Sequence, residues 1–206
     1  MHLYVDEHYT SPYALSVFVA LHVKQLTFEM STVDLARAAN HAPRYAELSI
    51  TQRVPTLVHD DFSLSESSAI VEYLDEVFPG TRLYPSAVRP RARARQVQAW
   101  LRSDLLPIRQ ERSTEHLFYS TPSSSLSSLA QAAAVKLYAG ALVLLPQGHA
   151  HLFGEWSIVD VDLALMLQRL ISQGDEVPAR LANYAAQQWQ HPAIQRWVTL
   201  SRPALS

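Results

Sequence analysis

A serine near the N-terminus is the first residue whose type and position could do chemistry. In "HYTSPYALSVFVAL", residues 8–21, Pro12 and a long apolar stretch follow Ser11 directly. Serine is a good N-cap, and proline fits the first helical position because its missing N–H has no helical partner there. Capping alone therefore explains the pattern. Because the N-terminal end of a helix is positive, the Ser11 hydroxyl could do a second job beside an anion.

The second candidate is "RVPTLV", residues 53–58, where a proline comes just before a short β-type run. This order is typical of a turn into an edge strand. A cis Val54–Pro55 bond would expose the backbone N–H and C=O of Val54, which could then pair with an extended, peptide-like ligand. An ordinary trans proline in a turn is the alternative, and trans is the commoner state of an X–Pro bond.

The third candidate is "SLSESSAI", residues 63–70. A helix that begins here would have free backbone N–H groups at Ser67 and Ser68, and the helix dipole would help them bind a carboxylate. Glu66 could meet an ammonium group beside that carboxylate, so the set would suit the α-amino acid end of a ligand. Capping with Ser65 as N-cap explains the same residues and is favoured by this stretch taken by itself.

Other patterns are assigned no chemistry. Ser157 and Asp160 form an S-x-x-D capping box, which indicates the start of a buried helix. His149 and His151 have no third ligand at a useful spacing, so we expect no metal. The chain has no cysteine, which excludes disulfides, thiolate nucleophiles and cysteine-ligated metals.

The composition is that of an ordinary globular protein. Of 206 residues, 48% are apolar and 17% charged, and the net charge of −2 gives no general attraction to nucleic acid or acidic membranes. The arginines of "RPRARAR" therefore indicate a solvated or dimer-facing surface. No secretory signal pattern is present, and the longest apolar stretch is too short for a membrane span. We expect a cytoplasmic protein with neither nucleic acid nor membrane as partner.

The elements that must position these residues come in two groups. The first 80 residues mix strand and helix periods in the order βαβ, then α, then ββα. A helix from Ser65 or Glu66 is expected to bury Ile70, Val71, Leu74 and Val77 on one face. The expected strands are residues 3–5, 26–33, 56–59 and 62–64, and the other expected helices are residues 12–24 and 42–48.

From Arg91 onward every expected element is helical. We expect one long helix over residues 91–112, a Ser/Thr-rich loop over 113–128, and helices over 129–145, 159–171, 179–190 and 192–201. The change of pattern near residues 80–90 predicts a domain over 1–82 and an all-α domain over 89–206.

Taken together these motifs resemble one family. A βαβ–ββα domain with Val-Pro before the third strand resembles the thioredoxin fold. With "SES", an all-helical second domain and the capping box, the whole chain resembles a cytosolic glutathione transferase. The stretches "SPY", "RVPTL", "LSESSAI" and "LFGEWSIVDVDLAL" are similar to the bacterial YfcF-type branch of that family. Two departures, "SITQ" before the Val-Pro and Val159 in the capping box, do not touch the proposed chemistry.

The resemblance implies a catalytic role for Ser11, as the residue that contacts the glutathione sulfur. A hydroxyl donor and the positive helix end would stabilise the thiolate, and each pKa unit corresponds to roughly 1.4 kcal/mol. Tyr9 and Thr10 are alternatives for the contact with sulfur. Because no cysteine is present, glutaredoxin-like disulfide exchange is excluded.

The same resemblance implies the residues that bind glutathione, which is the expected co-substrate. Val54, followed by Pro55, would bind the cysteinyl backbone, and Glu66 and Ser67 would hold the γ-glutamyl ammonium and carboxylate. Arg53 would reach the glycyl carboxylate.

The implied enzyme is a homodimeric, serine-type glutathione transferase that attacks small hydrophobic electrophiles, with a glutathione peroxidase activity on hydroperoxides as a further possibility. Asp104 in the long helix would approach the partner subunit's glutathione. The electrophile pocket would lie between the domains, where Trp100 and the loop of Tyr119 could line it. A non-catalytic glutathione-binding or protein-interaction module on the same fold is the alternative.

Overall fold

The computed structural model describes residues 1–205. These residues form two compact units, one of Met1–Leu83 together with the residues from Pro192 onward, and one of Tyr84–His191. The α/β thioredoxin-like and all-α classes expected from the sequence are both confirmed. The division predicted from the sequence, into domains 1–82 and 89–206, remains a proposal.

The first unit is built on a four-stranded sheet with the strand order β2-β1-β3-β4. β1 pairs with β2 in parallel and with β3 in an antiparallel manner, and β3 and β4 form the expected hairpin. The strands are β1 (His2–Asp6), β2 (Glu29–Val33), β3 (Thr56–His59) and β4 (Phe62–Ser65).

The register of the sheet brings three chain segments to one edge. Tyr4 near the end of β1 lies opposite Thr56 at the start of β3, and Thr56 lies opposite Ser65 at the end of β4. The residues that follow β1, precede β3 and follow β4 therefore leave the sheet on the same side. These are the three segments in which the sequence predicts ligand-binding residues.

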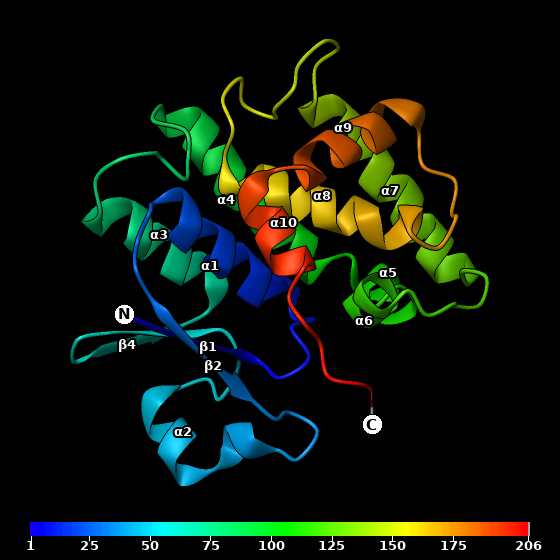
Figure 1. Cartoon of the computed structure of the whole chain (residues 1–206). Coiled ribbons are helices and arrows are strands. Elements are labelled where there is room, and N and C mark those ends of the chain that lie inside the picture. The colour runs from blue at the N-terminus through cyan, green and yellow to red at the C-terminus, as the bar shows by residue number, and fades with distance from the viewer. Residues whose placement is uncertain (206) are drawn as a thin grey trace. The chain divides into compact units, whose positions relative to one another are not determined.

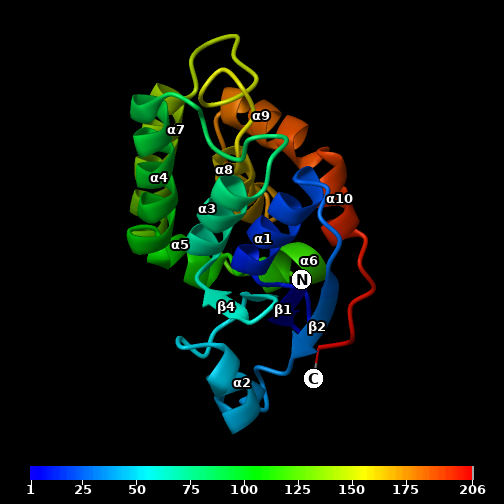
Figure 2. The ribbon, with the colours of Figure 1, turned by 90° about the vertical axis from the view of Figure 1, so that its left-hand side faces the viewer.

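Helices cover both faces of this sheet. Figures 1 and 2 show α1 and α3 on one face and α2 on the other. The last helix, α10, packs against α1, and its fully buried Trp197 meets Phe18 with ring centroids 5.2 Å apart. The helical elements of this unit are α1 (Pro12–Val23), the 3₁₀ turn η1 (Ala39–His41), α2 (Pro43–Leu48), α3 (Ser67–Val77) and α10 (Pro192–Val198).

The second unit is entirely helical among its named elements. Its central helix is α8, which is buried along almost its whole length and packs against both α4 and α9 (Figure 1). The helices are α4 (Val88–Ser103), α5 (Leu106–Glu111), α6 (Thr114–Tyr119), α7 (Ser128–Leu144), α8 (Ile158–Ile171) and α9 (Ala179–Trp189).

The capping box at the start of α8 is confirmed. The Asp160 carboxylate accepts the backbone N–H of Ser157 at 2.8 Å and the Ser157 hydroxyl at 3.0 Å. The same carboxylate accepts the Leu152 N–H and the Tyr184 hydroxyl, so all four donors around this buried acid are satisfied.

Several expected boundaries are wrong. The long helix over 91–112 is two helices, because Pro107 lacks an N–H and its ring would clash with the carbonyl of Ser103, where α4 ends. The Ser/Thr-rich loop over 113–128 contains α6, which begins after Ser113 caps it through the His116 N–H. The second strand begins only at residue 29, and Val77 is 48% exposed rather than buried.

No helix among residues 1–205 is both long enough and apolar enough to cross a bilayer.

Candidate active site

Ser11 lies at the N-cap of α1, as the sequence predicts. Its side-chain oxygen accepts the backbone N–H of Ala14 at 3.2 Å. Accepting this bond uses a lone pair and leaves the hydroxyl proton free to be donated. Within residues 1–205 no other group accepts that proton. The hydroxyl can therefore cap the helix and donate to a ligand anion at the same time.

Asp6 is a site residue that the sequence reasoning missed. It ends β1 and is 5% exposed, and its carboxylate accepts two backbone N–H groups, from Thr10 at 2.6 Å and from Ser11 at 2.9 Å. An acidic residue at a strand end, five positions before an N-cap, was the available signal. Its partners could not be known without the path of the loop.

Thr10 and Tyr9, the two alternatives to Ser11, make different contacts in the structure. The Thr10 hydroxyl donates to the Asp6 carboxylate at 3.0 Å. The Tyr9 ring packs edge-on against Trp197, and the Tyr9 carbonyl accepts a bond from Arg202 at 3.3 Å. The hydroxyl proton of Thr10 is thus used inside the loop, whereas that of Ser11 is available.

The Val54–Pro55 bond is cis. Val54 precedes the first paired residue of β3 and stands outside the strand ladder. The carbonyl of Arg53 accepts bonds from the hydroxyls of Tyr45 at 2.8 Å and Thr56 at 3.0 Å, which fixes the backbone just before Val54. The Arg53 side chain is exposed.

Glu66 is the N-cap of α3 and is exposed, while Ser67 is the buried first residue of that helix. No N-cap side chain bonds to the first turn of α3, so the expected capping by Ser65 is wrong. The first turn is therefore left without a side-chain cap, as a helix end that receives an anionic ligand would be.

A shared backbone feature marks all three segments. Tyr9, Gln52 and Glu66 are non-glycine residues in the left-handed region, with φ values of 49°, 52° and 73°. Each lies one or two positions before Ser11, Val54 or Ser67. Such conformations cost energy and gather at ligand sites, where neighbouring structure holds them. Four other non-glycine residues of the described chain share this conformation, so it is the sheet register that makes one edge of the first unit the candidate active site.

Asp104 lies elsewhere, at the C-cap of α4 in the second unit. Its carboxylate pairs with Lys136 and accepts the Trp100 indole N–H at 2.9 Å, and these two hydrogen bonds lower the pKa of Asp104. The Trp100 ring lies against Gly140, whose missing side chain makes room for it. A role for Asp104 toward a partner subunit stays a prediction.

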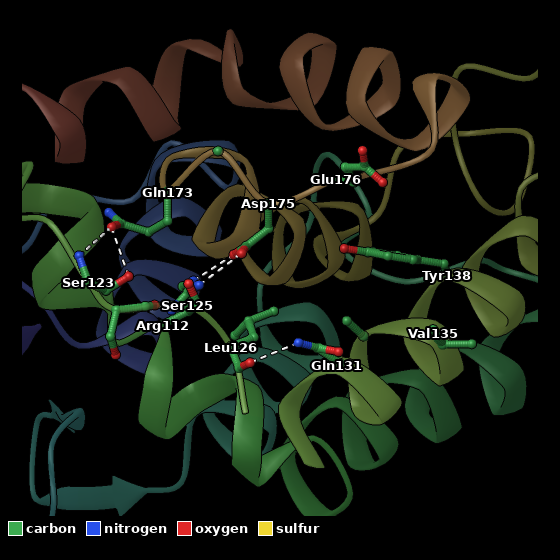
Figure 3. A pocket seen from close by; sticks show the side chains of 13 residues that line it. Arg112, Ser123, Ser125, Leu126, Gln131, Val135, Tyr138, Gln173, Asp175 and Glu176 are labelled. Carbon is green, nitrogen blue, oxygen red and sulfur yellow. Dashed lines mark hydrogen bonds and ion pairs between the residues drawn. The ribbon is translucent and has the colours of Figure 1, made fainter. Parts of the chain in front are cut away.

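The second unit also contains an open pocket of about 550 Å³, lined by none of the predicted site residues (Figure 3). Arg112 spans it with two bonds to Asp175, at 2.6 and 2.8 Å, so its charge is neutralised within the protein. Burial, and then the charge of Asp175, raise the pKa of Tyr138 to about 12. The pocket therefore holds a neutral phenol and a closed ion pair, with no cation free for an anionic ligand.

No group of three or more His, Cys, Asp or Glu side chains in the described part of the chain could hold a metal ion.

Two family models match the chain. The one described as "Glutathione S-transferase, N-terminal domain" matches residues 10–77, and the one described as "Glutathione S-transferase, C-terminal domain" matches residues 87–203.

Known proteins agree with these models. The crystal structure of a glutathione transferase homologue from Burkholderia BGR1, with bound glutathione, is 42% identical, with a TM-score of 0.77 over 96% of this chain and 95% of that chain. A maleylacetoacetate isomerase from Methylobacterium extorquens AM1, with bound malonate and glutathione, shares the fold at 24% identity and a TM-score of 0.76, over 98% of each chain.

Among curated relatives, a probable maleylacetoacetate isomerase of Vibrio cholerae is 31% identical over 57% of this chain and 55% of its own length. Glutathione S-transferase 1 of Dianthus caryophyllus is 37% identical over 46% of this chain and 43% of its own length. The matches thus span about half the length of these curated relatives.

Proposed function

Because this chain belongs to the glutathione S-transferase family, we propose that it ionises the thiol of glutathione for attack on small hydrophobic electrophiles. The observation that carries the proposal is the Ser11 hydroxyl, which caps α1 through its oxygen and keeps its proton free. A free thiol is mostly protonated at neutral pH, so a donor at a positive helix end favours the reactive anion. The enzyme is accordingly of the serine type.

The proposed binding site for glutathione follows the sheet edge. The backbone of Val54, which precedes Pro55 and lies outside the strand ladder, pairs with the cysteinyl part of the tripeptide. The uncapped start of α3 at Ser67 receives the γ-glutamyl carboxylate, and Glu66 receives the ammonium group beside it. The exposed Arg53 reaches the glycyl carboxylate. Each charged group of the ligand thus meets a group of the opposite sign.

In the proposed transfer, the thiolate sulfur forms a bond to an electrophilic carbon, and the leaving group departs with the electron pair. The same thiolate can attack a hydroperoxide, which gives an alcohol and a glutathione sulfenic acid. A second glutathione then displaces water to form the disulfide, so this peroxidase reaction consumes two thiols and needs no other reductant.

A second candidate is glutathione-dependent cis–trans isomerisation, favoured by the relatives named maleylacetoacetate isomerase. Thiolate addition to a conjugated double bond would allow rotation, and elimination would return the thiolate. A non-catalytic glutathione-binding or protein-interaction module is the third. Kinship with the YfcF-type branch and a cytoplasmic location remain parts of the proposal.

We further propose a homodimer through the second unit. The exposed side of α7 carries Leu129, Ala132, Ala139 and Val143 on either side of Lys136, whose ammonium group pairs with Asp104. Leu129 and Val143 are 73% and 84% exposed. An exposed apolar stripe of this kind is typical of a surface that a second copy covers. In that dimer Asp104 approaches the partner subunit's glutathione.

Two assays on the same preparation test the proposed function. The protein is passed over immobilised glutathione, and turnover is measured with a panel of aryl halides, enones, a cis-enone acid and a hydroperoxide. Retention with turnover supports an enzyme, and the substrate that is consumed decides between transfer, isomerisation and peroxide reduction. Retention with no turnover on any of them would favour the binding module, and failure to be retained would contradict both.

A further inference from the structure

The loop between β1 and α1 turns around the Asp6 carboxylate. Oδ2 accepts the N–H and the hydroxyl of Thr10, and Oδ1 accepts the N–H of Ser11. Within residues 1–205 no cation pairs with this buried acid. The donors to this carboxylate therefore belong to the two residues directly before α1, so Asp6 anchors the loop and is not half of an ion pair.

The anchor fixes the backbone from which the Ser11 side chain projects. A serine hydroxyl is one bond away from Cβ, so its direction follows the backbone once its oxygen caps the helix. Hydrogen bonds to a carboxylate are roughly twice as strong as neutral ones and hold this geometry more tightly. Tyr9, at φ 49°, lies inside the same turn, and the anchor helps to hold that unfavourable conformation.

We propose that Asp6 is a positioning residue for the thiolate site, which sets the Ser11 hydroxyl where it can donate to the glutathione sulfur. This inference rests on the proposed function of Ser11. Asp6 itself touches neither sulfur nor electrophile, and acts only through Thr10 and Ser11.

A positioning role and a purely electrostatic role have opposite signatures. A carboxylate near the sulfur opposes a second negative charge, so removal of its charge alone would lower the pKa of the bound thiol. Removal of the anchor instead lets Ser11 move away, which raises that pKa. Asp6→Asn keeps the size and loses the charge, and its amide NH₂ cannot accept an N–H, so one side of the anchor is lost.

The test is an ultraviolet titration of the thiolate of bound glutathione in wild type, Asp6→Asn and Ser11→Ala. We expect the thiol pKa to rise by about half a unit to one unit in Asp6→Asn, so that kcat/KM at neutral pH falls about three- to tenfold. Activity should recover at alkaline pH, where the thiol ionises unaided. Asp34→Asn is the matched control, since that carboxylate accepts the Arg37 N–H in another turn and bonds to neither Thr10 nor Ser11.

An unchanged thiol pKa in Asp6→Asn, with only a loss of stability, would overturn the inference, and so would a lowered pKa. If Asp6→Asn does not fold, Thr10→Val removes only the hydroxyl bond and should raise the pKa by a smaller amount, and no change there overturns the inference. A wild-type thiol that ionises as in plain buffer would overturn the proposed function too. A depressed wild-type pKa that rises in Ser11→Ala but not in Asp6→Asn would overturn the positioning role alone.

Discussion

The ring of Tyr9 meets the ring of Trp197 edge-on, with centroids 5.8 Å apart and planes at 88°. This contact joins the loop before α1 to the last helix of the chain, although the two residues are far apart in the sequence. Arg202 adds a hydrogen bond to the Tyr9 carbonyl from the segment after that helix. These contacts of Tyr9 are therefore made by its ring and its backbone carbonyl, and not by its hydroxyl.

From this contact we predict that Tyr9→Phe keeps turnover within about twofold of wild type, because the edge-on ring contact is retained. Tyr9→Ala should lower thermal stability, since it removes one of the two aromatic rings that contact Trp197. Steady-state kinetics and thermal unfolding of both variants check this. Loss of activity in Tyr9→Phe would transfer the role of sulfur donor from Ser11 to Tyr9.

His22 should make stability depend on pH. Burial, and then the charge of Arg196, lower the pKa of His22, and its ring packs against Phe18 and Phe28. Between the lowered pKa and the ordinary value near 6.5, the unfolded chain binds more protons than the folded one. The free energy of unfolding should therefore fall as the pH drops through and below about 6.5.

Urea unfolding across this pH range measures that effect. His22→Gln should flatten the dependence, while the control His149→Gln, at an exposed loop histidine, should leave it as in wild type. Equal slopes in wild type and His22→Gln would show that other groups cause the dependence.

Gly140 is predicted to resist replacement by alanine. In a helix interior this change usually gains about 1 kcal/mol. Here a Cβ would come within 2.8 Å of the Trp100 ring, which Asp104 holds through the indole N–H. We expect Gly140→Ala to destabilise the protein by about 1–3 kcal/mol in chemical unfolding. Trp100→Phe in the same chain should relieve most of that loss, whereas a stabilised single variant would contradict the close approach of α4 and α7.

The exposed stripe on α7 gives a prediction about assembly. Leu129→Asp together with Val143→Asp should convert the proposed dimer to a monomer, because two buried charges would face their copies across the interface. Light scattering after gel filtration measures the mass. Leu35→Asp, at an exposed leucine of the first unit, should leave the mass unchanged. A wild-type protein that is already monomeric would contradict the proposed homodimer.

Much of the fold could be predicted because local patterns agree with it. The alternation around the β3–β4 hairpin, the Ser11–Pro12 helix start and the capping box of α8 are each encoded within a few residues. The break between α4 and α5 was missed because the apolar spacing continues across Pro107. The helix α6 was missed because its serines and threonines suggested a loop, although Ser113 is an N-cap.

Only part of the candidate site, likewise, could be predicted from the sequence. Ser11 could be placed because Ser-Pro is typical of a helix start. The start of α3 could be placed because the apolar spacing of Ile70, Val71 and Leu74 predicts that helix, although the expected cap at Ser65 is wrong. The anchoring role of Asp6 could not, since it depends on a loop that turns back on the strand before it. The alignment of Tyr4, Thr56 and Ser65 likewise needs the strand register, which no local pattern states.

The central claim is that the Ser11 hydroxyl keeps the sulfur of bound glutathione deprotonated. Its most direct test is the pKa of that thiol, followed through the thiolate absorbance of the wild-type complex and of the Ser11→Ala complex. We predict that the wild-type value lies at least about one unit below that of free glutathione and that the variant loses most of this difference, which corresponds to roughly 1.4 kcal/mol. A wild-type complex whose thiol titrates as in plain buffer, or a Ser11→Ala complex that titrates as wild type does, would contradict it.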